Sequence, residues 1–229
     1  MNHADDVRTK ERRAYAVPHV LETRMALYRF FIGSSRTGEV IRHFEGFDGM
    51  RVLDLGCGNG ELAHEMLQTF PHAHIVGIDT SEPLLEQARI RCVNQSAEFI
   101  VNDASSVTLD GLFDRILLAH TLHLMADKPA MLAHALRHVT SGGRCVLTLH
   151  SSQDVPRKRG WIAWFEQMFH KKYCGSRESL TIESWDEVMG DEFLPVWRSV
   201  CSCARPRLHV GEGRVEPRWT RTRVRIGLA

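Results

Sequence analysis

The stretch Arg51-Val-Leu-Asp-Leu-Gly-Cys-Gly-Asn-Gly-Glu-Leu-Ala63 joins a short apolar run to three alternating glycines and then to the start of a helix. The run from Val52 to Leu55 is too short for a helix and is typical of a fully buried strand. The glycines let the backbone adopt positive φ and let a ligand approach without meeting a Cβ. The first N–H groups of a helix have no partner within the helix. A strand, a glycine turn and a helix N-terminus therefore predict a nucleotide-type pocket.

The composition is that of a globular protein and excludes several function classes. With 229 residues, 43% of them hydrophobic, the chain is long enough for one domain with a sizeable core. The formal net charge of +1 gives no general attraction to nucleic acid or to a membrane surface. There is no signal-peptide core, no apolar run of about 18 residues and no disulfide framework. We therefore expect a cytoplasmic protein, either a monomer or a homodimer.

After the opening stretch, short apolar runs alternate with segments of helical periodicity. The predicted strands are His74–Asp79, Glu98–Val101, Phe113–Leu118 and Arg144–Leu149, with a turn at Ser141–Gly143 before the last. This alternation predicts βαβ units and a parallel sheet. Ligands of such sheets bind outside the carboxyl ends of the strands. Asp79, Asp103 and His120 fall at those ends, on the same edge as the glycines.

The two ends of the chain follow other patterns. Residues 1–15 are polar and predict a loosely docked lead-in. Two helices are predicted before the first strand: one over Pro18–Phe31, and a short one that carries Val40 and Phe44 and ends at Gly46. They either cover the sheet edge or roof the ligand pocket. Near the C-terminus, Val196–Cys203 and Thr222–Leu228 alternate apolar with polar residues and predict antiparallel strands.

Glycine spacing and one carboxylate distinguish between two cofactor classes. The dinucleotide fingerprint is G-x-G-x-x-G, whereas this chain has glycines at 56, 58 and 60. Asp54 lies inside the strand, two residues before Gly56, where its charge opposes a pyrophosphate and suits a sulfonium or an ammonium group. Asp79 follows Gly60 by about 20 residues, near the spacing at which an acid reaches ribose hydroxyls.

The segment Val52-Leu-Asp-Leu-Gly-Cys-Gly-Asn-Gly60 resembles motif I of the class I S-adenosylmethionine-dependent methyltransferases. The resemblance covers residues 45–150 and continues in order through Gly77-Ile-Asp79, Asn102-Asp-Ala104, Phe113-Asp-Arg-Ile-Leu-Leu-Ala-His120 and Ser141-Gly-Gly-Arg144. It implies an α/β, doubly wound, Rossmann-like sheet of seven strands, mostly parallel with an antiparallel last strand and helices on both faces. The implied organisation is a single methyltransferase domain over 1–229, with an N-terminal helical cap (1–45), a cofactor-binding core (46–150), and lid helices with a C-terminal β-hairpin (151–229).

The resemblance also assigns roles to individual residues. It implies S-adenosyl-L-methionine as methyl donor and S-adenosyl-L-homocysteine as product. Asp54 would help to hold the ammonium group, Asp79 both ribose hydroxyls, and Asp103 the adenine amino group. The other implied cofactor contacts are Gly56, Cys57, Gly58, Gly60, Thr80, Ala104 and His120. Without the resemblance, Asp79 and Asp103 would be interpreted as a helix cap or a turn residue.

His120 and His123 follow the fourth predicted strand, where the family places residues that face the methyl group. A base is needed only if the nucleophile carries a proton at neutral pH. Either histidine is a candidate for that catalytic role, because histidine titrates near neutrality. Alternatively, His120 packs on the cofactor and His123 caps a loop.

Two further patterns concern substrate and metal. An aromatic stripe at helical spacing that includes Trp161, Trp164 and Phe165 is either core or substrate pocket. His134 and His138 have a metal-ligand spacing, but no motif completes a site, so we predict a solvent-facing pair and no metal.

Three functions remain open. The first is methylation of a small-molecule substrate at oxygen, nitrogen or carbon, with no membrane partner. The second is an RNA or protein methyltransferase that docks through the Arg-rich segment 198–229. Ala119-His-Thr-Leu122 argues against nucleic acid as a partner, because enzymes that methylate exocyclic amines of nucleic acids carry an Asp/Asn-Pro-Pro-aromatic motif there. The third is a non-catalytic protein that keeps the fold, against which the intact glycines and acids argue.

Overall fold

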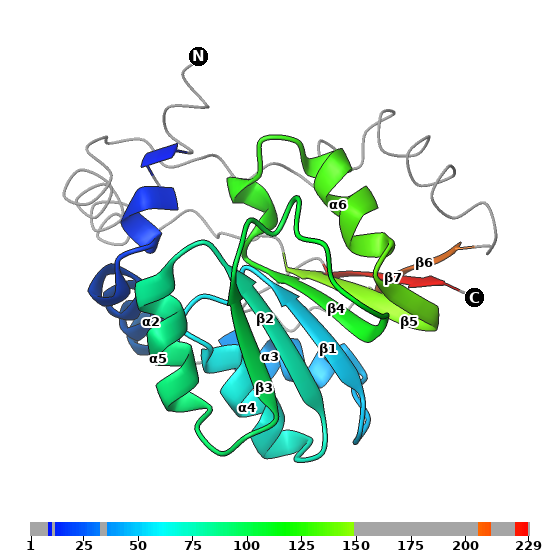
Figure 1. The fold of residues 1–229 in the computed structure, drawn as a ribbon, viewed down its shortest axis with the longest axis horizontal. Helices are drawn as coiled ribbons and strands as arrows, with labels where there is room; N and C mark the ends of the chain where they lie inside the picture. The colour runs from blue at the N-terminus through cyan, green and yellow to red at the C-terminus, as the bar shows by residue number, and fades with distance from the viewer. Residues whose placement is uncertain (1–8, 11, 33–35, 149–205, 212–222, 229) are drawn as a thin grey trace.

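The computed structural model describes residues 9–10, 12–32, 36–148, 206–211 and 223–228. Its centre is a parallel sheet of five strands: β1 (Arg51–Leu55), β2 (His74–Asp79), β3 (Ala97–Val101), β4 (Phe113–Ala119) and β5 (Val139–Thr148). They lie in the order β3-β2-β1-β4-β5 (Figure 1). The strand order reverses at β1, so β1 and β4 are neighbours and a ligand crevice opens at their carboxyl ends.

Two strands from the C-terminal part of the chain lie beyond β5. Strand β7 (Arg223–Leu228) pairs antiparallel with β5, and β6 (Pro206–Gly211) pairs antiparallel with β7. The predicted strand Thr222–Leu228 corresponds to β7. The predicted strand Val196–Cys203 lies outside the described residues, as does the aromatic stripe with Trp161, Trp164 and Phe165.

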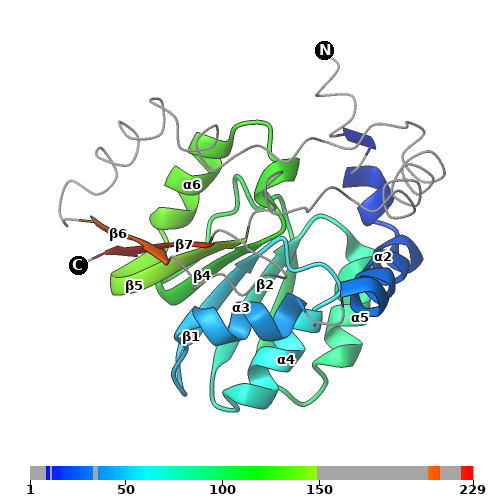
Figure 2. The same ribbon diagram turned by 180° about the vertical axis from the view of Figure 1, so that it is seen from behind.

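Helices cover both faces of the sheet. They are α2 (Pro18–Ile32), α3 (Arg36–Phe44), α4 (Glu61–Thr69), α5 (Glu82–Arg91) and α6 (Lys128–Leu136), with a short 3-10 helix, η1 (Leu122–Leu124). One face packs against α3, α4 and α5, and the other against α6 and η1 (Figures 1 and 2). In β1, Val52 belongs to the same buried cluster as Met66 of α4, whereas its neighbour Leu53 belongs to the cluster that contains Leu132 of α6. This alternation buries the strands on both sides and confirms the predicted α/β, Rossmann-like class.

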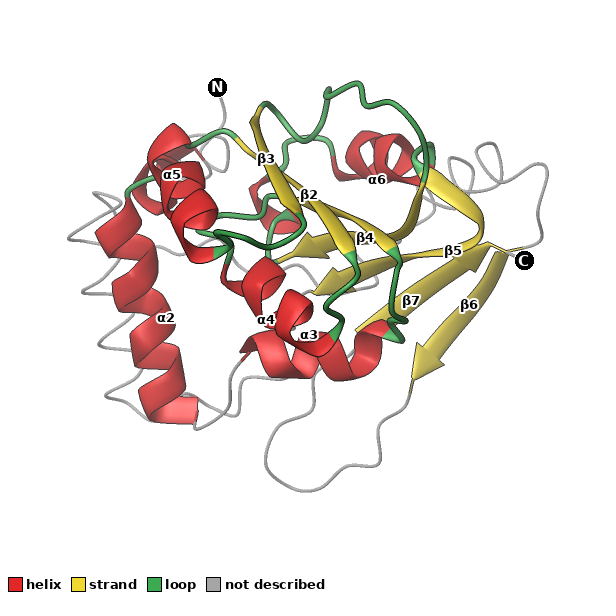
Figure 3. Ribbon diagram, turned by 60° about the horizontal axis from the view of Figure 1, so that its bottom comes forward, coloured by secondary structure: helices red, strands yellow, loops and turns green. Residues whose placement is uncertain are grey.

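The helices before β1 are held in defined positions. Figure 3 shows α2 beside α5, near the β3 edge of the sheet, and α3 next to α4. The guanidinium of Arg115, on β4, donates to the carbonyls of Phe44 at 3.2 Å and Glu45 at 2.6 Å. These carbonyls at the end of α3 have no partner within the helix, so the arginine satisfies them and fixes α3 against the sheet. None of the described helices is both long and apolar enough to cross a membrane.

Two predicted boundaries are wrong near β5. The residues Ser141–Gly143, predicted as a turn, lie inside the strand. The pairing with β4 is irregular there, and Gly142 has a φ of 78°, as in a β-bulge with extra residues on one strand. The glycines therefore bend the strand without ending it. The strand predicted to begin at Arg144 therefore begins at Val139, three residues after the end of α6 at Leu136.

Candidate active site

The site is built around the turn that follows β1. The N–H groups of Gly56 and Cys57 both donate to the carbonyl of Ile78, at 2.8 and 3.0 Å. These bonds tie the turn to the carboxyl end of β2. Gly56, Gly58 and Gly60 have φ values of 86°, 56° and 71°, in the left-handed region that favours glycine.

At two of the glycines, a Cβ would also collide with neighbouring residues. A Cβ on Gly60 would lie 2.7 Å from the Cβ and 2.9 Å from the Cα of Ala88, so α4 and α5 approach closely at this point. A Cβ on Gly56 would collide with the side chain of Thr121, which follows β4. The turn is therefore enclosed by α5 on one side and by the end of β4 on the other.

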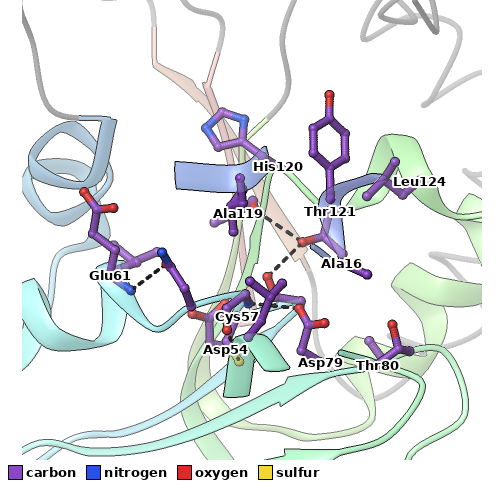
Figure 4. Close-up of a pocket in the computed structure, with 18 of the residues that line it drawn as sticks. Ala16, Asp54, Cys57, Glu61, Asp79, Thr80, Ala119, His120, Thr121 and Leu124 are labelled. Carbon is purple, nitrogen blue, oxygen red and sulfur yellow. Dashed lines mark hydrogen bonds between the residues drawn. The ribbon is translucent and has the colours of Figure 1, made fainter. Parts of the chain in front are cut away.

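A cavity of about 240 Å³ lies above this turn, at the carboxyl ends of the strands (Figure 4). The predicted cofactor residues that line it are Asp54, Gly56, Cys57, Gly58, Asp79, Thr80, Ala104 and His120. Gly60 and Asp103 are not among its lining residues: Gly60 packs on α5, and Asp103 is held by neighbouring side chains. The structure thus brings most of the predicted set to one cavity.

Asp79, at the end of β2, is fixed by backbone donors. One carboxylate oxygen accepts from the N–H of Gly58 at 2.9 Å and the other from the N–H of Ser81 at 2.9 Å. Burial raises the pKa of Asp79, although the N–H groups of Ser81, Gly58 and Thr80 and the charge of Arg12 oppose that shift. The carboxylate is therefore oriented before any ligand arrives.

Asp54 is in a different situation. Its side chain is 1% exposed, and its Oδ1 has no hydrogen-bond partner among the described residues. Burial, and then the charge of Asp79, raise the pKa of Asp54 to about 7. An unpaired buried carboxyl group is costly, and a cationic group at the cavity would satisfy it. The residues at this end of the cavity therefore fit a ligand with an ammonium or sulfonium group.

Asp103 connects the site to the N-terminal segment. Its Oδ1 accepts from the N–H and the hydroxyl of Ser105, at 2.8 and 2.6 Å, and its Oδ2 lies 3.4 Å from the guanidinium of Arg12. Burial raises the pKa of Asp103, but Ser105 and Arg12 outweigh it and lower that pKa overall. The hydroxyl of Ser81 also donates to the carbonyl of Ala16 at 2.7 Å. The prediction of a loosely docked lead-in is therefore wrong for residues 12–15, since the contacts of Arg12 and Ala16 hold this segment to the core.

His120 lines the cavity from the end of β4, and in the view of Figure 4 its ring lies above Cys57 of the turn. Its φ of 57° is uncommon for a residue with a side chain and is typical of strained functional positions. The Thr121 hydroxyl lies 3.2 Å from the carbonyl of Ala119 and 3.4 Å from that of Gly56, which links this segment to the glycine turn. The other predicted base, His123, lies in η1.

The sequence alone did not identify the part of the cavity wall that comes from the helices before β1. The cavity-lining residues from that region are Arg12, Tyr15, Ala16, Leu21, Met25, Thr37 and Val40. The helices before β1 were predicted either to cover the sheet edge or to roof the ligand pocket. Their lining residues show that they roof the pocket. No local motif marks these residues, because their contacts with the cavity are tertiary.

The histidine pair formed by His134 in α6 and His138 just after it differs from its prediction. His134 is only 7% exposed, and its Nδ1 lies 2.9 Å from the guanidinium of Arg137, so it does not face solvent. Burial, and then the charges of His138 and Arg137, lower the pKa of His134. Among the described residues, no three histidine, cysteine or carboxylate side chains are grouped so that they could hold a metal ion.

Comparison with known proteins adds independent information. The family described as "Methyltransferase domain" matches residues 47–192. The chain is 34% identical over 97 residues to the ubiquinone/menaquinone biosynthesis C-methyltransferase UbiE of Desulfotalea psychrophila, over 42% of this chain and 39% of that protein. It is 22% identical over 184 residues to the malonyl-[acyl-carrier protein] O-methyltransferase of Bacillus anthracis, over 80% of this chain and 64% of that protein. The chain therefore spans less than two thirds of the length of either relative.

The fold is also that of solved methyltransferases. The plantazolicin methyltransferase BamL, in complex with a triazolic desmethylPZN analog and S-adenosylhomocysteine, superposes with a TM-score of 0.69 at 14% identity, over 98% of this chain and 96% of that one. The family match spans more than half of the chain, and it includes the glycine turn, Asp79 and the end of β4. The chain belongs to the class I S-adenosylmethionine-dependent methyltransferase family.

Proposed function

We propose that this protein transfers a methyl group from S-adenosylmethionine to a small-molecule acceptor, at oxygen, nitrogen or carbon. One arrangement carries the proposal: the unpartnered carboxyl of Asp54, the fixed carboxylate of Asp79 and the strained His120 line the same cavity. A dinucleotide would place a pyrophosphate against Asp54, whereas a sulfonium with an α-ammonium complements it.

The cofactor would lie along the carboxyl ends of the strands. Asp54 would hold the ammonium group and Asp79 the ribose hydroxyls, with Gly58 allowing close approach. Asp103, next to the cavity-lining Ala104, would accept from the adenine amino group. When bound, S-adenosylmethionine supplies an electrophilic methyl group and leaves as S-adenosylhomocysteine.

The residues of the chain would then align the acceptor and exclude water, which is the main source of rate acceleration for a displacement of this kind. If the acceptor atom carries a proton, a histidine at the end of β4 would take it onto a ring nitrogen. His120 lines the cavity and is one candidate, and His123 in η1 is the other.

Asp79→Asn is expected to weaken the binding of S-adenosylmethionine by about a hundredfold, because two charge-assisted hydrogen bonds to the ribose would be weakened. Titration calorimetry would measure this loss. Asp110→Asn, at an exposed position outside the cavity, is the matched control and should bind normally. Unchanged affinity of Asp79→Asn would contradict the ribose assignment.

His120→Asn and His123→Asn together test the base. Asparagine tolerates the left-handed backbone of residue 120, so the fold should be kept while the imidazole is removed. The variant that lacks the base should lose about a hundredfold in turnover, and its rate should no longer depend on a group titrating near neutrality. Cofactor affinity should change little. If both variants keep the wild-type rate and pH profile, neither histidine is the base.

We further propose that residues 1–229 form one methyltransferase domain with a seven-stranded sheet whose last strand is antiparallel. Residues 1–45 would be the helical cap, 46–150 the cofactor-binding core, and 151–229 the lid helices and C-terminal hairpin. The docking of Arg12 and Ala16 on the core supports the first of these assignments.

A further inference from the structure

We propose that the methyl acceptor is a neutral molecule with an apolar body, bound between α2, α3 and the segment that follows β4. This inference rests on the proposed function, because it concerns the part of the cavity that the cofactor would leave open. It names the chemical class of the acceptor, which neither the family nor the relatives fix.

The part of the cavity wall that the cofactor would not contact is mainly apolar. The cofactor accounts for the lining residues at the ends of β1, β2 and β3. The large apolar lining residues that come from α2, α3, α4 and the segment after β4 are Leu21, Met25, Val40, Leu62, Leu124 and Met125. Apolar lining with few polar groups is typical of sites for small apolar ligands.

This wall is part of the folded core and adjoins the methyl-donor region. The Cδ2 of Leu21 lies 3.3 Å from the position that a Cβ on Gly58 would occupy, so α2 rests on the glycine turn. Val40 is 7% exposed and shares a core cluster with Leu62 of α4. Since Arg115 also anchors the end of α3, the apolar surface is held in place beside the turn.

The charges on the cavity wall argue against an anionic acceptor. Apart from His120, the acidic and basic side chains among the described lining residues are Arg12, Asp54, Glu61 and Asp79. Among the described lining residues, the one guanidinium is that of Arg12, which is paired with Asp103 after the end of β3. A carboxylate placed among the described apolar residues would meet carboxylates and no nearby cation, which is strongly unfavourable.

Within the described part of the cavity wall, a cationic acceptor would also lack a counter-charge. Asp54 and Asp79 would be occupied by the ammonium and the ribose of the cofactor. Glu61 already faces Arg91, with 4.0 Å between the carboxylate and the guanidinium. Among the described lining residues, the polar side chains contributed by the N-terminal helical segment and by the residues after β4 are, besides Arg12, Tyr15, Thr37, His120 and Thr121. These side chains suit a hydroxyl or a carbonyl on an otherwise apolar molecule.

Three aromatic probes of the same frame test this inference: naphthol, naphthoate and naphthylmethylammonium. Each would be titrated by calorimetry at neutral pH into the full chain saturated with S-adenosylhomocysteine, so that no turnover occurs. Naphthol should bind at least about tenfold more tightly than either charged probe, because burial of an unpaired charge is costly. Equal or tighter binding of naphthoate or naphthylmethylammonium would overturn the inference.

Matched variants on one helix locate the binding surface. Met25→Gln keeps the size of a cavity-lining side chain but makes it polar, and it should weaken naphthol binding about tenfold. Ala26→Gln places the same amide on the exposed side of α2 and should have no effect. Affinity for S-adenosylhomocysteine should be normal in both, which shows that the variants are folded. Unchanged naphthol binding by Met25→Gln would overturn the assignment of the wall, whereas a wild-type protein that does not bind S-adenosylhomocysteine would overturn the proposed function itself.

Discussion

Asp54→Asn is expected to stabilise the cofactor-free protein while weakening its affinity for S-adenosylmethionine. The carboxyl group is 1% exposed, and its Oδ1 has no partner among the described residues. Its pKa is about 7 instead of 3.8. Ionising it in the folded state costs on the order of 4 kcal/mol above neutral pH. An imperfectly paired amide offsets part of this gain, so the free energy of unfolding should rise by about 1–3 kcal/mol.

The direction of the pH dependence follows from the raised pKa. Below 3.8 the carboxyl is protonated in both the folded and the unfolded chain, and it contributes no charge penalty. Between 3.8 and about 7 only the unfolded chain ionises readily, so the stability of the wild type falls as pH rises. The difference between Asp54→Asn and wild type should thus be small near pH ~4 and largest near pH ~8, as measured by chemical denaturation.

The affinity of Asp54→Asn for S-adenosylmethionine should fall, although its stability rises. Loss of the charged partner of an ammonium group should weaken S-adenosylmethionine binding by about tenfold to a hundredfold at neutral pH. Asp110→Asn, at an exposed position, controls for the loss of one negative charge and should alter neither quantity. A destabilised Asp54→Asn protein near neutral pH would mean that the ionised carboxylate has a favourable partner, and the cationic-ligand assignment would lose its basis.

Gly60→Ala is expected to lower the free energy of unfolding by about 3 kcal/mol, because backbone strain and steric overlap act together. The new Cβ would sit 2.7 Å from the Cβ and 2.9 Å from the Cα of Ala88, so a backbone shift of α4 or α5 is needed to relieve the contact. Residue 60 also has a φ of 71°, which disfavours any side chain.

Gly142→Ala separates the two effects. Its φ of 78° is similar, but a Cβ there would meet nothing within 4 Å. The free energy of unfolding of Gly142→Ala should therefore fall only by the cost of backbone strain, about 1 kcal/mol. Denaturant unfolding of both variants would give the difference, which reports the packing of α4 on α5. If the two variants lose equal stability, steric overlap with Ala88 does not contribute to the destabilisation caused by Gly60→Ala.

Local patterns were sufficient to predict the central sheet. The strand His74–Asp79 has the predicted bounds, and the other parallel strands that precede β5 differ from prediction by one residue at an end. Buried parallel strands are short, continuous apolar runs between turn residues, so each is readable without knowledge of its neighbours. The same holds for the glycine turn, whose conformation depends on the residues in it.

The parts that could not be predicted depend on contacts between distant segments. Nothing near Arg12 in the sequence indicates Asp103 as its partner. The bulge at Gly142 and the burial of His134 likewise depend on how β4 and α6 pack. The left-handed backbone of His120 is another example, since Thr121 holds that segment against a turn 65 residues earlier.

The bonds from Gly56 and Cys57 to the Ile78 carbonyl, with that from Gly58 to Asp79, have a consequence for binding entropy. Fixing the backbone of one residue costs about 1–2 kcal/mol of conformational entropy. For these three residues the loss occurs during folding, because their N–H groups are already bonded within the protein. The turn is therefore preorganised, and cofactor affinity is reduced little by ordering of this loop. Any ordering that does accompany binding falls on other segments.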